Sequence, residues 1–77
     1  MKEKVLNLLS TEFADVDFTA SEALMDDGIL DSLILVELIS ALSMEYGIMI
    51  PYEEITPENF NSIAAISNLV ERLMQGA

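Results

Sequence analysis

A short acidic turn followed by a serine is the part of this 77-residue sequence best suited to chemistry. Asp31 and Ser32 follow a glycine turn at Gly28 and precede a long apolar-periodic stretch that ends at Gly47. Either Asp31 or Ser32 can cap the start of a helix, because a short oxygen-bearing side chain accepts a hydrogen bond from a free first-turn amide. The Ser32 hydroxyl then lies at the positive end of the helix dipole, where a phosphate group is stabilised. The segment therefore predicts a site for attaching an anionic group.

Most other kinds of reactive site are excluded by residue types that the chain lacks. The sequence has no histidine and no cysteine, so it has no catalytic triad, no imidazole base, no thiolate ligand for zinc and no disulfide. Paired carboxylates such as Asp26 and Asp31 could do acid–base work, but so small a domain has no evident layer that forms a cleft. Asp26-Asp27-Gly28 resembles the start of a calcium loop, yet it lacks the alternating ligand spacing and the terminal glutamate. We therefore expect neither an enzyme nor a specific metal site.

The charge of the chain restricts its partners. Fourteen acidic residues against three basic ones give a net charge of −11 at pH 7. Nucleic acids and anionic membrane surfaces repel such a chain, whereas basic protein surfaces complement it. No apolar run approaches the ~20 residues of a membrane span, and the N-terminal segment lacks the cleavage region of a signal peptide. We expect a soluble, cytoplasmic monomer with no membrane insertion, destabilised at low salt by self-repulsion.

The composition and periodicity predict an all-α fold. Apolar residues make up 52% of the sequence, which is too many for a disordered chain, and strand-type alternation is scarce. We predict a four-helix bundle formed by residues 1–77 as one domain, with three main helices, one short helix and a long first loop. The main helices are predicted at residues 2–13, from Asp31 or Ser32 to Tyr46, and from an Asn61 or Ser62 cap to just before Gly76. The short helix starts at a Thr56 cap with Pro57 in its first position.

A helical wheel divides the second predicted helix into two faces. The inward stripe consists of Leu35, Leu38, Ile39, Leu42 and Tyr46. The opposite face carries Leu33, Glu37, Ser40 and Met44. An exposed leucine and methionine beside a glutamate exceed what solvation requires, so this face is a candidate partner surface. Isolated apolar residues are common on protein surfaces, so the alternative is an ordinary surface, or ordinary packing against the first loop or residues 51–54.

Residues 15–30 form the long first loop. Loops of this length are uncommon in a small domain and usually have a functional or packing role. Recurring apolar residues predict that this loop lies against the bundle: Val16, Phe18, Leu24, Met25, Ile29 and Leu30. Thr19 to Glu22 matches a capping box and predicts one helical turn from Ala23. Phe60, just before the last helix, is expected to be a core residue.

The segment from Gly28 to Tyr46, with Asp31-Ser32-Leu33 near its start, resembles the acyl carrier protein family and its aminoacyl and peptidyl carrier relatives. The resemblance extends over nearly the whole chain in length, acidity and helix order. In that family the serine carries a 4′-phosphopantetheine arm, which a phosphopantetheinyl transferase attaches and whose thiol holds the cargo as a thioester. The resemblance implies that Ser32 is the attachment site, flanked by Asp31 and Leu33. It also implies that the partner-facing residues are Leu33, Glu37, Ser40 and Met44.

Some positions differ from the carriers of fatty acid synthesis. Those carriers generally have acids directly after the motif and late in the second helix, where this chain has Ile34, Ser43 and Met44. Residues 55–63 look more like the carriers of D-alanine loading and related systems. The resemblance thus implies a stand-alone carrier that is loaded by an adenylating ligase, serves a specialised acyl, aminoacyl or polyketide pathway, and passes its cargo to acyl-transferring enzymes. The alternative is a small acidic helical adaptor without a prosthetic group.

Overall fold

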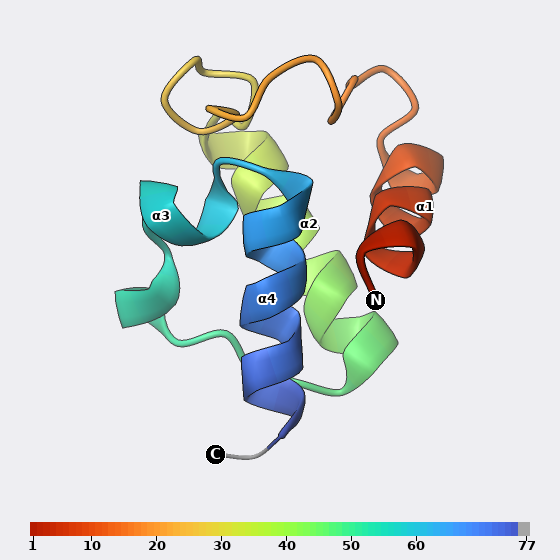
Figure 1. Cartoon of the computed structure of the whole chain (residues 1–77), viewed down its shortest axis with the longest axis vertical. Coiled ribbons are helices and arrows are strands. Elements are labelled where there is room, and N and C mark those ends of the chain that lie inside the picture. The colour runs from red at the N-terminus through yellow and green to blue at the C-terminus, as the bar shows by residue number, and fades with distance from the viewer. Residues whose placement is uncertain (76–77) are drawn as a thin grey trace.

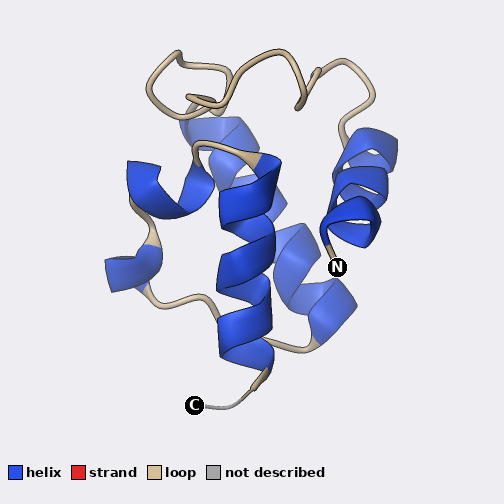
Figure 2. Cartoon of the chain, in the orientation of Figure 1, coloured by secondary structure: helices blue, strands red, loops and turns tan. Residues whose placement is uncertain are grey.

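The computed structural model describes residues 1–75, whose regular structure is entirely helical (Figure 2). The elements in chain order are α1 (Lys2–Glu12), α2 (Ser32–Tyr46), the 3₁₀ helix η1 (Tyr52–Glu54), α3 (Pro57–Phe60) and α4 (Ile63–Met74). This arrangement confirms the predicted all-α bundle of three main helices and one short helix. Gly76, predicted to follow the last helix, lies outside the described residues. Among residues 1–75, no helix combines the length and the apolar composition required to cross a membrane.

Helix α4 is the centre of the bundle and contacts α1, α2 and α3 (Figure 1). Its apolar stripe buries Ile63, Ile66, Leu69 and Val70, and Leu73 at its end is half-buried. The same core receives Val5 and Leu9 from α1 and Leu38 and Leu42 from α2. Phe60 at the end of α3 is 0% exposed, which confirms that it is a core residue. The other predicted core residues of α2 are only half-buried: Leu35, Ile39 and Tyr46.

Several predicted helix ends are confirmed, and one is only partly right. Gly47 ends α2 in the left-handed conformation with φ 62°, and its N–H donates to the Ser43 carbonyl. Ser62 is the N-cap of α4, where its Oγ accepts a hydrogen bond from the Ala65 N–H at 3.0 Å. Thr56 occupies the N-cap position of α3, but its side chain makes no capping bond. That short helix is instead positioned by the burial of Phe60.

The first loop arches over one end of the bundle between α1 and α2 (Figure 1). Phe18, Leu24 and Leu30 bury their side chains in the core, which confirms that the loop packs against the helices. These anchors explain how a long irregular segment is held in place without regular secondary structure, because each buried side chain adds apolar contact with the core.

The capping box predicted at Thr19 is wrong. The Thr19 N–H and hydroxyl both donate to Asp17 Oδ1, at 2.9 and 2.7 Å, because an aspartate side chain readily bonds the backbone two residues further on. These hydrogen bonds lower the pKa of Asp17. A single hydrogen-bonded turn does start at Ala23, whose carbonyl accepts the Asp27 N–H at 2.7 Å. It is preceded by Ser21, not by a Thr19 cap, since Ser21 Oγ accepts the Ala23 N–H at 2.9 Å.

A polar cluster holds η1 against α3 and α4 at the opposite side of the molecule from α1. Arg72 lies 3.3 Å from Glu54 in the ion pair found within the described residues. Asn59 donates to the Glu54 carbonyl at 2.8 Å and accepts a hydrogen bond from Arg72 at 3.2 Å. The cluster neutralises one acid of a strongly acidic chain.

We predict that added salt raises the melting temperature of this protein. With a net charge of −11 and so little ion pairing, repulsion between carboxylates destabilises the compact state, and mobile ions screen it. Differential scanning calorimetry at low and high sodium chloride checks this. Glu12→Gln, at the last residue of α1 where the helix dipole disfavours an acid, should raise the melting temperature at low salt and have a smaller effect at high salt. A melting temperature that does not respond to salt would contradict the prediction.

Candidate functional site

Asp31 is the residue that starts α2. Its backbone is extended, with φ −76° and ψ 178°, and its Oδ1 accepts a hydrogen bond from the Ile34 N–H at 2.9 Å. Its carbonyl accepts the Leu35 N–H at 2.8 Å, which is the first hydrogen bond of the helix. Of the two candidates for the cap, the structure therefore selects Asp31. Ser32 becomes the first residue of the helix.

Ser32 is exposed at the N-terminal end of a 15-residue helix. The N–H groups of the first helical turn lack intrahelical acceptors, and those of Ser32 and Leu33 precede the one that Asp31 caps. Free amides and the dipole both stabilise negative charge at this point. The three basic residues of the chain lie on α1 and α4, so the electrostatic complement for an anion on Ser32 comes from the helix end itself. The residues present therefore fit a phosphodiester attached to the Ser32 oxygen.

A hydrogen bond between its two ends closes the turn that leads into Ser32. Gly28 has φ 78°, a conformation that L side chains rarely adopt, and it reverses the chain. Beyond it, the Leu30 N–H donates to the Leu24 carbonyl at 3.0 Å, which joins the two ends of the turn. Leu24 and Leu30 are 0% and 3% exposed. The chain thus leaves the core at Leu30, and Asp31 follows as the cap of α2.

Sequence reasoning missed the residue that holds this turn, Asn61. Its Oδ1 accepts the N–H groups of Met25 and Asp26 at 2.9 and 3.1 Å, and its Nδ2 donates to Asp26 Oδ2 at 3.0 Å. The sequence pattern had offered Asn61 only as an alternative cap for the last helix. A contact between residues 35 or 36 positions apart leaves no local signal in a single sequence.

The two acidic residues of the turn, Asp26 and Asp27, accept hydrogen bonds from different partners. Asp26 accepts a hydrogen bond from Asn61, whereas Asp27 accepts one from the Ser21 hydroxyl at 2.7 Å. Within residues 1–75, no group of three or more acidic side chains is arranged to hold a metal ion. What these two carboxylates do in the structure is stabilise the turn ahead of Ser32.

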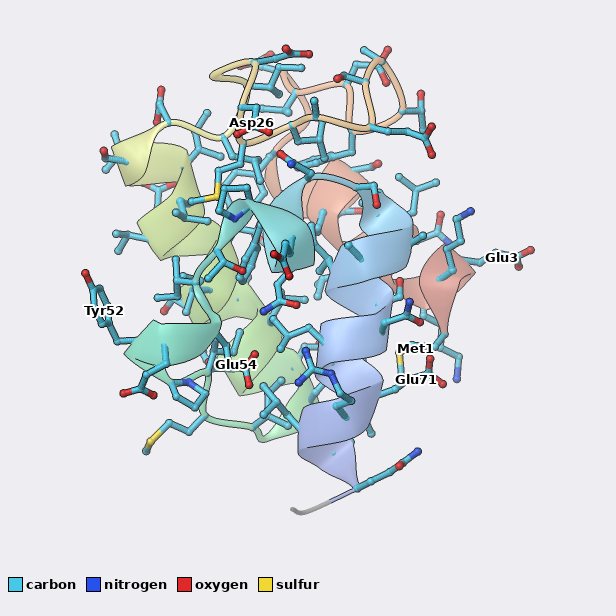
Figure 3. All side chains as sticks on the ribbon, turned by 60° about the vertical axis from the view of Figure 1, so that its left-hand side comes forward. Met1, Glu3, Asp26, Tyr52, Glu54 and Glu71 are labelled. Carbon is cyan, nitrogen blue, oxygen red and sulfur yellow. The ribbon has the colours of Figure 1, made fainter. Side chains whose placement is uncertain are left out.

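The predicted partner face of α2 is open to solvent. Leu33 and Met44 are 68% and 84% exposed, and Glu37 and Ser40 are also exposed. Val36 at 65% belongs to the same face and was missed, because on the wheel it lies at the border between the two stripes. Two further exposed apolar side chains follow α2: Met49 in the segment between α2 and η1, and Tyr52 in η1. Tyr52 points away from the bundle (Figure 3). Contact of this face with a partner stays a prediction.

Comparison with known proteins places these features in context. The family model described as the phosphopantetheine attachment site matches residues 3–71. A D-alanyl carrier protein of Streptococcus suis (strain 05ZYH33) is 37% identical over 75 residues, which cover 96% of this chain and 95% of that protein. A D-alanyl carrier protein of Streptococcus pyogenes serotype M5 (strain Manfredo) is 36% identical over 74 residues, which cover 95% of this chain and 94% of that protein. The similarity therefore extends over nearly the full length of these proteins.

We predict that the Asp31 cap contributes measurably to stability. Asp31→Ala removes the acceptor for the Ile34 N–H and should lower the free energy of unfolding by about 1 kcal/mol, as measured by urea denaturation. Asp31→Asn removes the same charge but keeps a side-chain oxygen that can accept the hydrogen bond, so its free energy of unfolding should fall much less. Equal losses for the two variants would mean that the cap hydrogen bond is not what stabilises the start of α2.

Proposed function

Because the chain belongs to the acyl carrier protein family, whose prosthetic group is 4′-phosphopantetheine, we propose that this arm is attached to Ser32. The observation that carries the proposal is the position of Ser32, exposed as the first residue of α2 directly after its capping aspartate. Asp31 and Leu33 flank the attachment point. Asp31 holds the first turn of the helix in shape, and Leu33 extends an apolar surface away from it.

The chain's own residues suit this role. In the attachment, the Ser32 oxygen bonds to the phosphorus that coenzyme A carries next to its pantetheine half. The bond from that phosphorus to the bridging oxygen of the diphosphate breaks, the nucleotide half leaves with that oxygen, and the serine proton is released to solvent. The start of α2 then stabilises the negative charge of the phosphodiester. When bound, the arm supplies a terminal thiol that holds an acyl or aminoacyl group as a thioester. Since the chain has no cysteine, it has no thiol of its own for this chemistry.

The protein is a carrier, and we propose that its cargo is an aminoacyl group of the D-alanyl type, loaded by an adenylating ligase. The similarity to D-alanyl carrier proteins over nearly their whole length supports this choice. So do the positions on α2 where this chain has Ile34, Ser43 and Met44 instead of the acids that are general in carriers of fatty acid synthesis. We further propose that residues 1–77 act as one monomeric unit that visits a phosphopantetheinyl transferase, the ligase and an enzyme that accepts the cargo. An adaptor without a prosthetic group has no specific observation in its favour.

We predict that Ser32→Ala abolishes modification. Incubation of the wild-type protein with coenzyme A and a broad-specificity phosphopantetheinyl transferase should add the mass of one phosphopantetheine group, and peptide mapping should locate it on Ser32. Ser10→Ala removes an exposed serine on α1, outside the partner face, and serves as the control, which should be modified like the wild type. Modification of the Ser32→Ala variant would contradict the site, and a wild-type chain that stays unmodified would favour the adaptor.

We also predict that Met44→Glu lowers kcat/KM for loading of the modified carrier with D-alanine by a D-alanine-activating ligase. An acid in place of an exposed apolar contact should lower kcat/KM about tenfold, which is the effect of losing one important interface side chain. Met49→Glu is the matched control, because Met49 is as exposed as Met44, at 84%, but lies outside α2. Equal losses for both variants would indicate a general effect of added charge and would contradict a specific role for the α2 face.

A further inference from the structure

We propose that Asn61 is a positioning residue for the modification of Ser32, because it holds the turn ahead of Ser32 in the conformation that the transferase recognises. The turn in question is the segment of residues 24–30, here called the presenting turn. This inference rests on the proposed attachment of the arm to Ser32. It assigns a function to a residue that lies 29 positions further along the chain.

Asn61 binds the presenting turn through its backbone and through its side chain. The Asn61 carbonyl accepts the Leu24 N–H at 2.8 Å, and its Oδ1 accepts the N–H groups of Met25 and Asp26 at 2.9 and 3.1 Å. Its Nδ2 donates to Asp26 Oδ2 at 3.0 Å, and Figure 3 shows Asp26 on the loop beside the α3–α4 connection. Three consecutive amides of the turn are thus satisfied by one residue. Backbone amides of an irregular segment need such partners because no helix or sheet supplies them.

Asn61 itself is held in a rigid part of the fold. It lies between Phe60, which is 0% exposed, and Ser62, which caps α4. It is the C-cap residue of α3, and its N–H donates to the carbonyl of Pro57, the first residue of that helix, at 2.9 Å. The junction between α3 and α4 therefore serves as a fixed point for the more exposed loop.

The constraint continues from Asn61 to Ser32 through the closed turn. The Leu24 peptide unit links both parts: its N–H donates to Asn61, and its carbonyl accepts the Leu30 N–H at 3.0 Å. Leu30 is buried and is followed directly by Asp31, which caps α2. When Asn61 releases the turn, the residues that precede Ser32 lose their fixed path, while the body of α2 stays packed in the core.

The expected kinetic consequence is specific. If only a fraction of the apo protein has the presenting turn in place, the transferase binds only that fraction, and the apparent affinity falls in proportion. Once the protein is bound, the turn is ordered and the chemistry proceeds as before. Loss of Asn61 should therefore raise KM for the apo protein and leave kcat unchanged, provided that dissociation is fast relative to the chemical step.

The test compares Asn61→Ala with Asn59→Ala in the transferase reaction with coenzyme A, at a temperature where both variants are folded by circular dichroism. Asn59 is a matched control: its carboxamide is also half-buried and bonds Glu54 and Arg72, away from the presenting turn. We expect Asn61→Ala to raise KM about fivefold or more with kcat unchanged, and Asn59→Ala to leave both as in the wild type. Hydrogen exchange should become faster at Met25 and Asp26 in Asn61→Ala only.

A double variant that exchanges the side chains of positions 61 and 26 conserves the net charge and tests whether the KM can be restored. Asn61→Asp keeps an acceptor for the two amides but places a carboxylate against Asp26, so it should raise KM as Asn61→Ala does. The double variant Asn61→Asp with Asp26→Asn restores a donor and acceptor pair in the reverse order and should return KM to within about twofold of the wild type. Merely structural damage at position 61 would not be repaired by this exchange.

The outcomes separate this inference from the proposed function. An unmodified wild-type protein, or a modified Ser32→Ala variant, would refute the attachment site itself. Normal modification of the wild type together with an unchanged KM for Asn61→Ala, an equal rise in KM for Asn59→Ala, or a failed rescue by the double variant would overturn the role of Asn61 alone.

Discussion

The presentation of Ser32 depends on how an irregular loop is fixed to a small helical bundle. A chain of this size buries only about 60% of its unfolded surface, so its core has few side chains to spare. In the described part of the chain, three of the thirteen buried apolar side chains, Phe18, Leu24 and Leu30, nevertheless come from the loop. The loop is thus part of the core, and its last buried residue lies two positions before the serine. Packing fixes where the loop lies, and hydrogen bonds to Asn61 fix its shape.

The charge and the apolar face of α2 have different physical effects on recognition. A net charge of −11 acts over long distances and accelerates encounters with basic surfaces, but salt screens it and it confers little selectivity. In the proposed docking, the exposed side chains of Leu33, Val36 and Met44 would act only on contact, where the burial of apolar surface distinguishes one enzyme surface from another. An acidic carrier that uses such a face for recognition, as we propose, would therefore meet many basic proteins and remain bound to few.

The features that the sequence predicted correctly are those with a local pattern. The helix ends at Gly47 and Ser62 and the buried Phe60 each follow from a residue type beside an apolar stripe. The place of Ser32 at the start of α2 follows in the same way, whereas its role as attachment site stays a prediction. The Thr19 capping box failed because Asp17, two residues earlier, bonds the same side chain. Asn61 could not be found, because an asparagine that binds a loop has the same local sequence as one that starts a helix. Val36 was missed since exposure at the border of a wheel depends on which neighbouring segment covers it.

Recognition and chemistry are coupled because both depend on the same helix. With a rise of 1.5 Å per residue, Met44 lies about 18 Å along α2 from Ser32, and the rigid helix keeps the two in a fixed relation. An enzyme that contacts Leu33, Val36 and Met44 therefore sets the axis of α2 and with it the direction of the Ser32 side chain. This geometric control is lost if the first turn of α2 frays. The Asp31 cap prevents fraying from the side of the helix, and the turn held by Asn61 limits it from the side of the loop. The polar contacts near Ser32 thus make an exposed serine a defined target, while the arm that we propose is attached there would keep its own freedom of movement.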